Sequence, residues 1–288
     1  MIYLLLSILS SVVTVSFFKL FQKFHVNTFH AIIINYLICV LMGNITSGQA
    51  IILTPFWQEP WFIYAFFVGV LFITIFYCIG ETAQKMGVSV SMVSAKLSVV
   101  IPVLFAFFFH NETLGLIKII GILISLFAVY FISIKNDAHY SNKMIWLPVL
   151  VFIGSGFIDT LLKHIESTYI PPASASSIVS TAFLVAFILG SAFISIKHIQ
   201  QKQRVEMKNI YWGIALGIPN YFSMFFLVKT LENFSATYIF PINNIGIVAG
   251  STIISLLFFA EKLSRKNIIG LALAIVSIII ISFSDVVF

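Results

Sequence analysis

The sequence predicts an all-α integral membrane protein whose ten transmembrane helices form two inverted five-helix repeats, 1–137 and 138–288. Hydrophobic residues make up 60% of its 288 residues and charged residues only 9%, against about 25% charged in soluble domains. Ten apolar segments are long enough to cross a bilayer, and one sequence pattern recurs 149 positions along the chain. Because each repeat has an odd number of helices, the second enters the membrane from the opposite side.

The ten segments each meet the requirement of about 20 mostly apolar residues for a spanning helix. In chain order they are 2–21, 28–45, 60–83, 88–109, 115–134, 145–164, 174–196, 208–231, 236–259 and 265–285. The longest connections, 46–59 and 197–207, are too short for a soluble domain. The tryptophans lie at span ends, as the membrane interface favours: Trp57, Trp61, Trp146 and Trp212.

The repeat rests on two matches between the halves. Residues 112–133 and 261–282 share a glutamate, a leucine two positions later, the triplet Ile-Ile-Gly and, after an apolar run, a serine. Residues 11–19 match 155–163 with a different spacing, which pairs the first helices of the two halves. A repeat of this length decides the architecture before any single residue does.

Basic residues predict the orientation. Connections after the odd-numbered spans carry twelve of the sixteen lysines and arginines, the opposite connections carry three, and Lys96 lies inside a span. Since cytoplasmic loops are enriched in Lys and Arg, both termini are predicted to face outward from the plasma (inner) membrane. The first span follows Met1 without a basic segment or cleavage site, so we expect it to be retained.

Several functional classes lack their sequence signals. The net charge of +6 comes from scattered basic residues, which argues against a nucleic-acid partner. Cys39 and Cys78 both fall inside apolar spans and indicate neither a disulfide framework nor a metal site. The six histidines lie at or near span ends and form no catalytic motif, and no ATP-binding loop is present. We therefore expect no enzyme activity, no catalytic residue and no cofactor.

A second pattern covers 83–121. A glycine starts the fourth span, a proline lies within it, a glutamate ends it and a glycine follows in the next helix: Gly87, Pro102, Glu112 and Gly121. In these features the segment resembles the EamA domain of the drug/metabolite transporter superfamily. The resemblance covers nearly the whole chain as two copies and implies a ten-helix secondary transporter, in a family whose substrates range from amino acids to nucleotide sugars and cations.

The second copy departs from the first in its prolines. It keeps Glu261 and Gly270, but Ser251 stands where the first copy has Pro102, and Pro241 lies near the helix start. Ten-helix members of the family commonly have cytoplasmic termini, whereas the basic residues here predict outward ones. We retain the orientation that this sequence indicates.

Two charged residues lie within the spans. Lys96 is about eight residues into the fourth span, roughly 12 Å from its start, where a lysine is costly unless it faces a protein interior or a wet cavity. There it could bind an anion or exchange a proton; alternatively its stem could reach the interface. Asp159 in the sixth span is the natural opposite charge, and its repeat counterpart is Val15. It could instead pair with Lys163, four residues further along the same helix face.

Uncharged polar pairs complete the candidate substrate site: Asn35 and Tyr36, Asn220 and Tyr221, and Asn243 and Asn244. Each could equally hydrogen-bond a neighbouring helix, for about 0.6 kcal/mol. Pro219 and Pro241 precede the last two pairs and, like Pro102, are predicted kinks that free backbone carbonyls. Glu112, Glu261, Gly121 and Gly270 recur in both halves, so we expect structural or gating roles for them.

These features predict a secondary transporter, not driven by ATP, that moves a small amphipathic, amino-acid-like or other anion-bearing solute by alternating access. Its partners are that solute, the lipid bilayer and, as candidate coupling ion, protons. Import and export both remain open, with export as one hypothesis, as do the monomeric and homodimeric states. The alternatives are a channel, a receptor or a structural membrane protein, and lastly an intramembrane enzyme.

Overall fold

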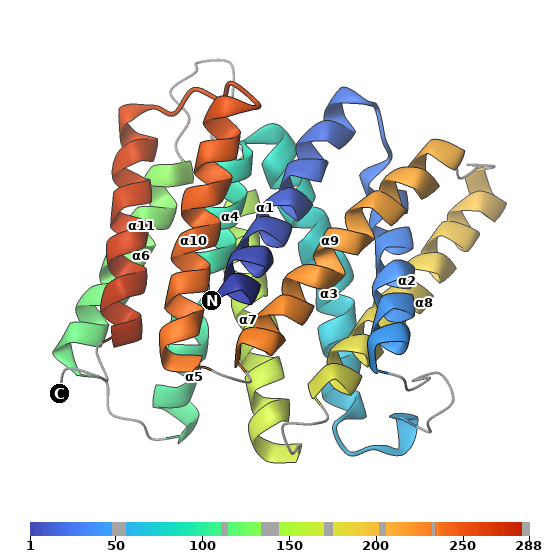
Figure 1. Ribbon diagram of the computed structural model, residues 1–288, viewed down its shortest axis with the longest axis horizontal. Coiled ribbons are helices and arrows are strands. Elements are labelled where there is room, and N and C mark those ends of the chain that lie inside the picture. Colours follow the sequence, from blue (N-terminus) through green and yellow to red (C-terminus); the bar gives the residue numbers. More distant parts are fainter. Residues whose placement is uncertain are drawn as a thin grey trace.

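The structure is a computed structural model that describes residues 1–47, 56–110, 115–133, 144–169, 175–201, 206–231, 234 and 236–283 (Figure 1). Every regular element in these ranges is helical. The first half contains α1 (Ile2–Lys23), α2 (Thr28–Ser47), the short η2 (Phe56–Gln58), α3 (Phe62–Lys85), α4 (Val88–Leu97), α5 (Val100–His110) and α6 (Leu116–Ser133). The second contains α7 (Trp146–Tyr169), α8 (Ala175–Gln201), α9 (Met207–Leu231), α10 (Ala236–Leu257) and α11 (Arg265–Phe283).

The predicted all-helical membrane fold is confirmed. Six described segments are long and apolar enough to cross a bilayer: Ile2–Lys23, Thr28–Thr46, Phe62–Lys85, Val88–Phe105, Ile178–Ile196 and Met207–Thr230. Three shorter apolar segments, Ile119–Ile132, Trp146–Leu162 and Ile242–Leu257, lie within α6, α7 and α10. Each predicted span corresponds to one helix, with one exception.

The exception is the fourth span, which is two helices rather than one bent helix. α4 ends at Leu97, Ser98 and Val99 form a turn, and α5 begins at Val100. Pro102 explains the break, because it has no N–H to donate to the carbonyl of Ser98 and its ring crowds that oxygen. The Ser98 carbonyl instead accepts the N–H of Ile101 at 2.9 Å, in a tighter turn.

The helices pack in pairs that the repeat relates to each other. Equating α1, α2 and α3 with α7, α8 and α9 turns the contact of α2 with α9 into that of α8 with α3. It likewise turns the contact of α1 with α9 into that of α7 with α3. Three helices contact their own counterparts: α2 with α8, α6 with α11, and α4 with α10. In Figure 1 the α6 and α11 pair lies at one end of the molecule, and α2 and α8 lie toward the other.

Counterpart helices run antiparallel. A Cβ on Gly121 would lie 2.7 Å from the Ile281 side chain, and a Cβ on Gly270 would lie 2.6 Å from the Ile132 backbone. Each of these contacts becomes the other when 149 is added to the first-half residue and subtracted from the second-half residue. Therefore the start of α6 meets the end of α11, and the start of α11 meets the end of α6. A two-fold axis that reverses helices in this way crosses them, and so lies in the membrane plane.

Candidate functional site

The depth of Lys96 follows from the register of α4 against α10. The hydroxyls of Ser89 and Thr252 lie 2.9 Å apart across this antiparallel pair. Seven residues after Ser89 comes Lys96, and seven residues before Thr252 comes Ile245. With the same rise per residue in both helices, Lys96 and Ile245 lie at one level. They are also repeat counterparts, so this level is that of the two-fold axis, midway through the bundle.

Three residues near this level have polar groups without a hydrogen-bond partner among the described residues: Lys96, Ser94 and Asn244. Lys96 is half-buried and has no hydrogen-bond or ion-pair partner among the described residues. The hydroxyl of Ser94 is completely buried and also lacks a partner there. Asn244, adjacent to Ile245, is half-buried, and no bond of its side chain is found within the described ranges. A completely buried hydroxyl without a partner, as at Ser94, is rare in proteins, which makes this level a candidate site.

Asp159 approaches the same level from α7, which packs against both α4 and α5. Its carboxylate lies 3.3 Å from the hydroxyl of Ser98, in the turn between α4 and α5. That hydroxyl also lies 2.6 Å from the carbonyl of Ala95 and has one hydrogen, so it donates to one acceptor at a time. Asp159 and Lys96 interact electrostatically but form no ion pair within 4.0 Å.

The second-span pair is bound into the helix packing. Asn35 is fully buried, and its side-chain oxygen accepts from Asn220 of α9 at 3.0 Å. Asn220 also donates to the sulfur of Cys39 at 3.6 Å. The Tyr36 hydroxyl donates to the carbonyl of Phe72 at 2.7 Å, and its ring stacks on Phe183. These side chains connect α2 with α3, α8 and α9, so the structure gives them packing partners.

Two of the remaining predicted polar residues, Asn243 and Tyr221, lie against neighbouring helices. Asn243 is buried, and its side-chain oxygen lies 3.4 Å from the hydroxyl of Ser7 on α1, which also lies 2.7 Å from the carbonyl of Ser223. Tyr221 forms a hydrogen bond with Thr46 at the end of α2. Pro219 lies inside an unbroken α9, and Pro241 likewise falls within α10. Thus Lys96 and Asp159 lie near the break and Asn244 lies at about the same level on α10, whereas the other predicted polar residues bond to neighbouring helices.

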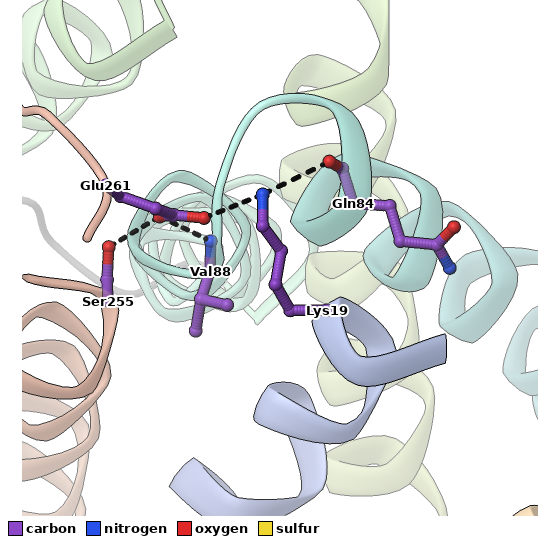
Figure 2. Close-up of polar contacts among 5 residues, drawn as sticks. All are labelled: Lys19, Gln84, Val88, Ser255 and Glu261. Carbon is purple, nitrogen blue, oxygen red and sulfur yellow. Dashed lines mark hydrogen bonds and ion pairs between the residues drawn. The ribbon is translucent and has the colours of Figure 1, made fainter. Parts of the chain in front are cut away.

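One end of the bundle is tied together by Glu261, in the connection between α10 and α11 (Figure 2). One carboxylate oxygen lies 2.9 Å from the ammonium of Lys19, at the end of α1. The other accepts the backbone N–H of Val88 at 3.2 Å and the Ser255 hydroxyl at 2.5 Å. Lys19 also donates to the carbonyl of Gln84, 3.3 Å away. We call Lys19, Gln84, Val88, Ser255 and Glu261 the Glu261 cluster.

Glu112, the repeat counterpart of Glu261, lies outside the described residues. Gly121 and Gly270 lie where the counterpart helices α6 and α11 pack closely, and their structural role stays a prediction. Sequence reasoning missed Ser94 and Ser98, although their spacing of four placed them on one face of the helix that carries Lys96. It also missed Ser255, for which the sequence offered no signal.

The fold is that of a polytopic membrane protein built from inverted repeats. Residues 142–283 match the model of the EamA-like transporter family. The second half of the chain therefore belongs to this family, within the drug/metabolite transporter superfamily, whose members are transporters rather than enzymes.

The chain is also similar to two further proteins. An uncharacterized protein of Haemophilus influenzae is 26% identical over 223 residues, which are 76% of this chain and 74% of that protein. A solved crystal structure with 15% sequence identity superposes with a TM-score of 0.53 and covers 96% of this chain and 98% of its own. At that identity the structural likeness establishes a shared fold.

Proposed function

We propose that this protein is a secondary transporter that moves a small amphipathic metabolite with an anionic group by alternating access, with Lys96 as the anion-binding residue. The observation that carries the proposal is the unpartnered Lys96 at the level of the two-fold axis, next to a broken span. In transporters with inverted repeats, substrate sites lie at the repeat interface near the bilayer midplane, typically at discontinuous helices.

The charge of Lys96 supports an anionic substrate. An ammonium in low-dielectric surroundings is unfavourable alone, and an approaching carboxylate or phosphate offsets that penalty. The hydroxyl of Ser94 and the amide of Asn244 offer hydrogen bonds at the same depth. The end of α4 and the start of α5 add backbone groups that would be hydrogen-bonded within a continuous helix.

Asp159 supports proton coupling. It is the second charge near the break, and it has Ser98 as a hydrogen-bond partner rather than a fixed cation. A substrate anion that pairs with Lys96 changes the field at Asp159, so that substrate and proton binding influence each other. We propose protons as the coupling ion on this basis.

The orientation belongs to the same proposal. With outward termini, the connections after the odd-numbered spans are cytoplasmic, and they include the α1–α2 connection that contains His25. A single cysteine at His25 should react with an impermeant maleimide only after the membrane of intact cells is opened. Ready reaction from outside would reverse the proposed orientation.

The substrate class is tested by a stability screen of the purified protein against a metabolite library. A ligand at 100 times its Kd should stabilise the fold by about 2.7 kcal/mol. We expect hits to carry an anionic group and an apolar portion. Lys96→Met, which keeps the stem and removes the charge, should abolish their effect, whereas Lys23→Met at the exposed end of α1 should not. If Lys96→Met folds and binds the hits unchanged, Lys96 does not bind the substrate.

A further inference from the structure

The Glu261 cluster joins segments that are far apart in the chain. A single carboxylate contacts the end of α1 through Lys19, the start of α4 through Val88, and the end of α10 through Ser255. The N–H of Glu261 also donates to the carbonyl of Ser255 at 3.0 Å, which fixes the connection that carries the carboxylate. These three helices include both members of the α4 and α10 pair that contains Lys96.

The backbone around the carboxylate is shaped to fit it. Gly87, the residue before α4, has a φ of 118°, which favours glycine, and a Cβ there would lie 2.6 Å from the Glu261 carboxylate. Ala260 has a φ of 48°, an uncommon conformation for a residue with a Cβ, immediately before Glu261. The negative charge then lies at the positive end of the α4 dipole.

The cluster is partly shielded from solvent. The side chain of Lys19 is 23% exposed and that of Glu261 is 13% exposed. Removing one partner of a shielded pair leaves the other charge unsatisfied, so such a pair resists separation more than a surface pair does. By contrast, Glu81 and Lys85, at the same end, form an ion pair whose two residues both belong to α3.

One short helix, α4, connects the Glu261 cluster to Lys96. α4 has only ten residues, or about 15 Å of helix. Its first N–H is held by Glu261, and its last turn contains Lys96 and leads into the break at Ser98. Because the break separates α4 from α5, α4 can tilt about Ser98 without moving the whole span.

We infer that Glu261 is a positioning residue: it latches the start of α4 to α1 and α10, and so closes the path between Lys96 and this end of the protein. The latch opens when Glu261 leaves Lys19 and Val88, and α4 then tilts about the break to expose Lys96 on that side. The inference rests on the alternating access proposed above. It adds the contact that must break in each cycle.

The test measures access to the site without any substrate. In a background with Cys39→Ser and Cys78→Ser, Asn244→Cys places a single thiol at the level of Lys96. An impermeant maleimide is applied from the membrane face on the Lys19 side, using oriented vesicles. With Glu261→Gln, which keeps the shape and removes the charge, we expect the reaction rate from this face to rise about tenfold, since closed and open states of such proteins differ by a few kcal/mol.

Two further variants separate the latch from folding defects. Gly87→Ala should displace the carboxylate sterically and give the same rise with every charge retained. Glu81→Gln, the matched control at the same end, should leave the rate unchanged. Size-exclusion chromatography reports folding, and if Glu261→Gln does not fold, Gly87→Ala carries the test. Folded Gly87→Ala and Glu261→Gln proteins with unchanged rates would overturn the latch, even where ligands still bind at Lys96. Loss of ligand binding by Lys96→Met bears only on the proposed function.

Discussion

The fourth span and its repeat counterpart α10 cross at the level of the two-fold axis, yet only the fourth is broken. α4 ends at Leu97 and α5 starts at Val100, whereas α10 is continuous from Ala236 to Leu257. Ser251 stands in α10 where Pro102 stands in α5, and its hydroxyl donates to the carbonyl of Val248 within the helix. One proline thus accounts for a discontinuity that the duplicated scaffold does not require.

The charged residues show the same asymmetry. Lys96 has Ile245 as its repeat counterpart, and the exposed Asp159 corresponds to Val15, which is almost completely buried in the core. Both charges lie beside the break, and neither has a charged counterpart in the other half. The comparison teaches that the repeat supplies the scaffold, whereas the polar groups that could bind a substrate belong to single copies.

The largest expected effect comes from making the fourth span resemble its counterpart at Lys96. Lys96→Ile removes the charge, and the affinity for an anionic ligand from the stability screen should fall about 100-fold, or about 3 kcal/mol, the upper value for a charged hydrogen bond. Isothermal titration measures the loss.

Transferring the charge tests whether the break matters as well. Lys96→Ile combined with Ile245→Lys puts the ammonium at the same level on the unbroken helix. We expect no recovery of affinity, because α10 offers neither the free backbone groups nor Asp159. Full recovery would show that charge alone defines the site and that the broken helix has no part in binding.

The next effect is on stability and concerns Gly121 and Gly270, the counterparts that pack α6 against α11. A Cβ at Gly270 would meet the backbone nitrogen of Ile132 at 2.6 Å, whereas at Gly121 it would meet side-chain carbons of Ile281 and Ile280. Backbone cannot yield as side chains can, so Gly270→Ala should destabilise by about 2–3 kcal/mol and Gly121→Ala by about 1 kcal/mol or less. Equal shifts in thermal unfolding would mean that the two contacts are equivalent.

The scaffold was predictable because local sequence patterns determine it. Apolar length identified the spans, and the frame around Gly121 and Gly270 identified the repeat. The same period predicted that α6 and α11 are counterparts, and their close antiparallel packing follows from the small residues in that frame.

The site was predictable only in part. A lysine inside an apolar span is energetically costly in the membrane, so the sequence alone indicated Lys96 as a candidate. Whether an amide is free or bonded depends on a residue from another helix. Asn35 and Asn244 look alike in sequence, yet Asn35 accepts from Asn220, 185 positions away. Likewise, the ligands of the Glu261 carboxylate come from α1, α4 and α10, and no local pattern connects them.

A smaller effect is expected from Pro102→Ser, which makes the fourth span resemble α10 at the break itself. The new N–H can bond the carbonyl of Ser98, so the helix should become more continuous and the protein more stable by about 1 kcal/mol, part of the penalty of a proline in a helix. Ligand affinity should fall about tenfold as the free backbone groups are used. Thermal unfolding and titration measure the two changes together.

Pro219→Ser is the matched control for that experiment. Pro219 lies in α9, which is continuous, so its replacement should raise stability without reducing ligand affinity. An equal loss of affinity in both variants would mean that proline kinks in general, rather than the break beside Lys96, support binding.

The smallest expected effect is the coupling between Lys96 and Asp159. The two charges interact without an ion pair, and the Asp159 carboxylate accepts a hydrogen bond from Ser98. Asp159→Val gives this position its counterpart's residue. In a double-mutant cycle with Lys96→Ile, the combined loss of ligand affinity should differ from the sum of the single losses by about 0.5–1 kcal/mol, the lower range for coupled residues. Additive losses would mean that the two charges act separately, and the proposed link between substrate and proton would then fail. A coupling that disappears in a Ser98→Ala background would instead locate the link in the turn between α4 and α5.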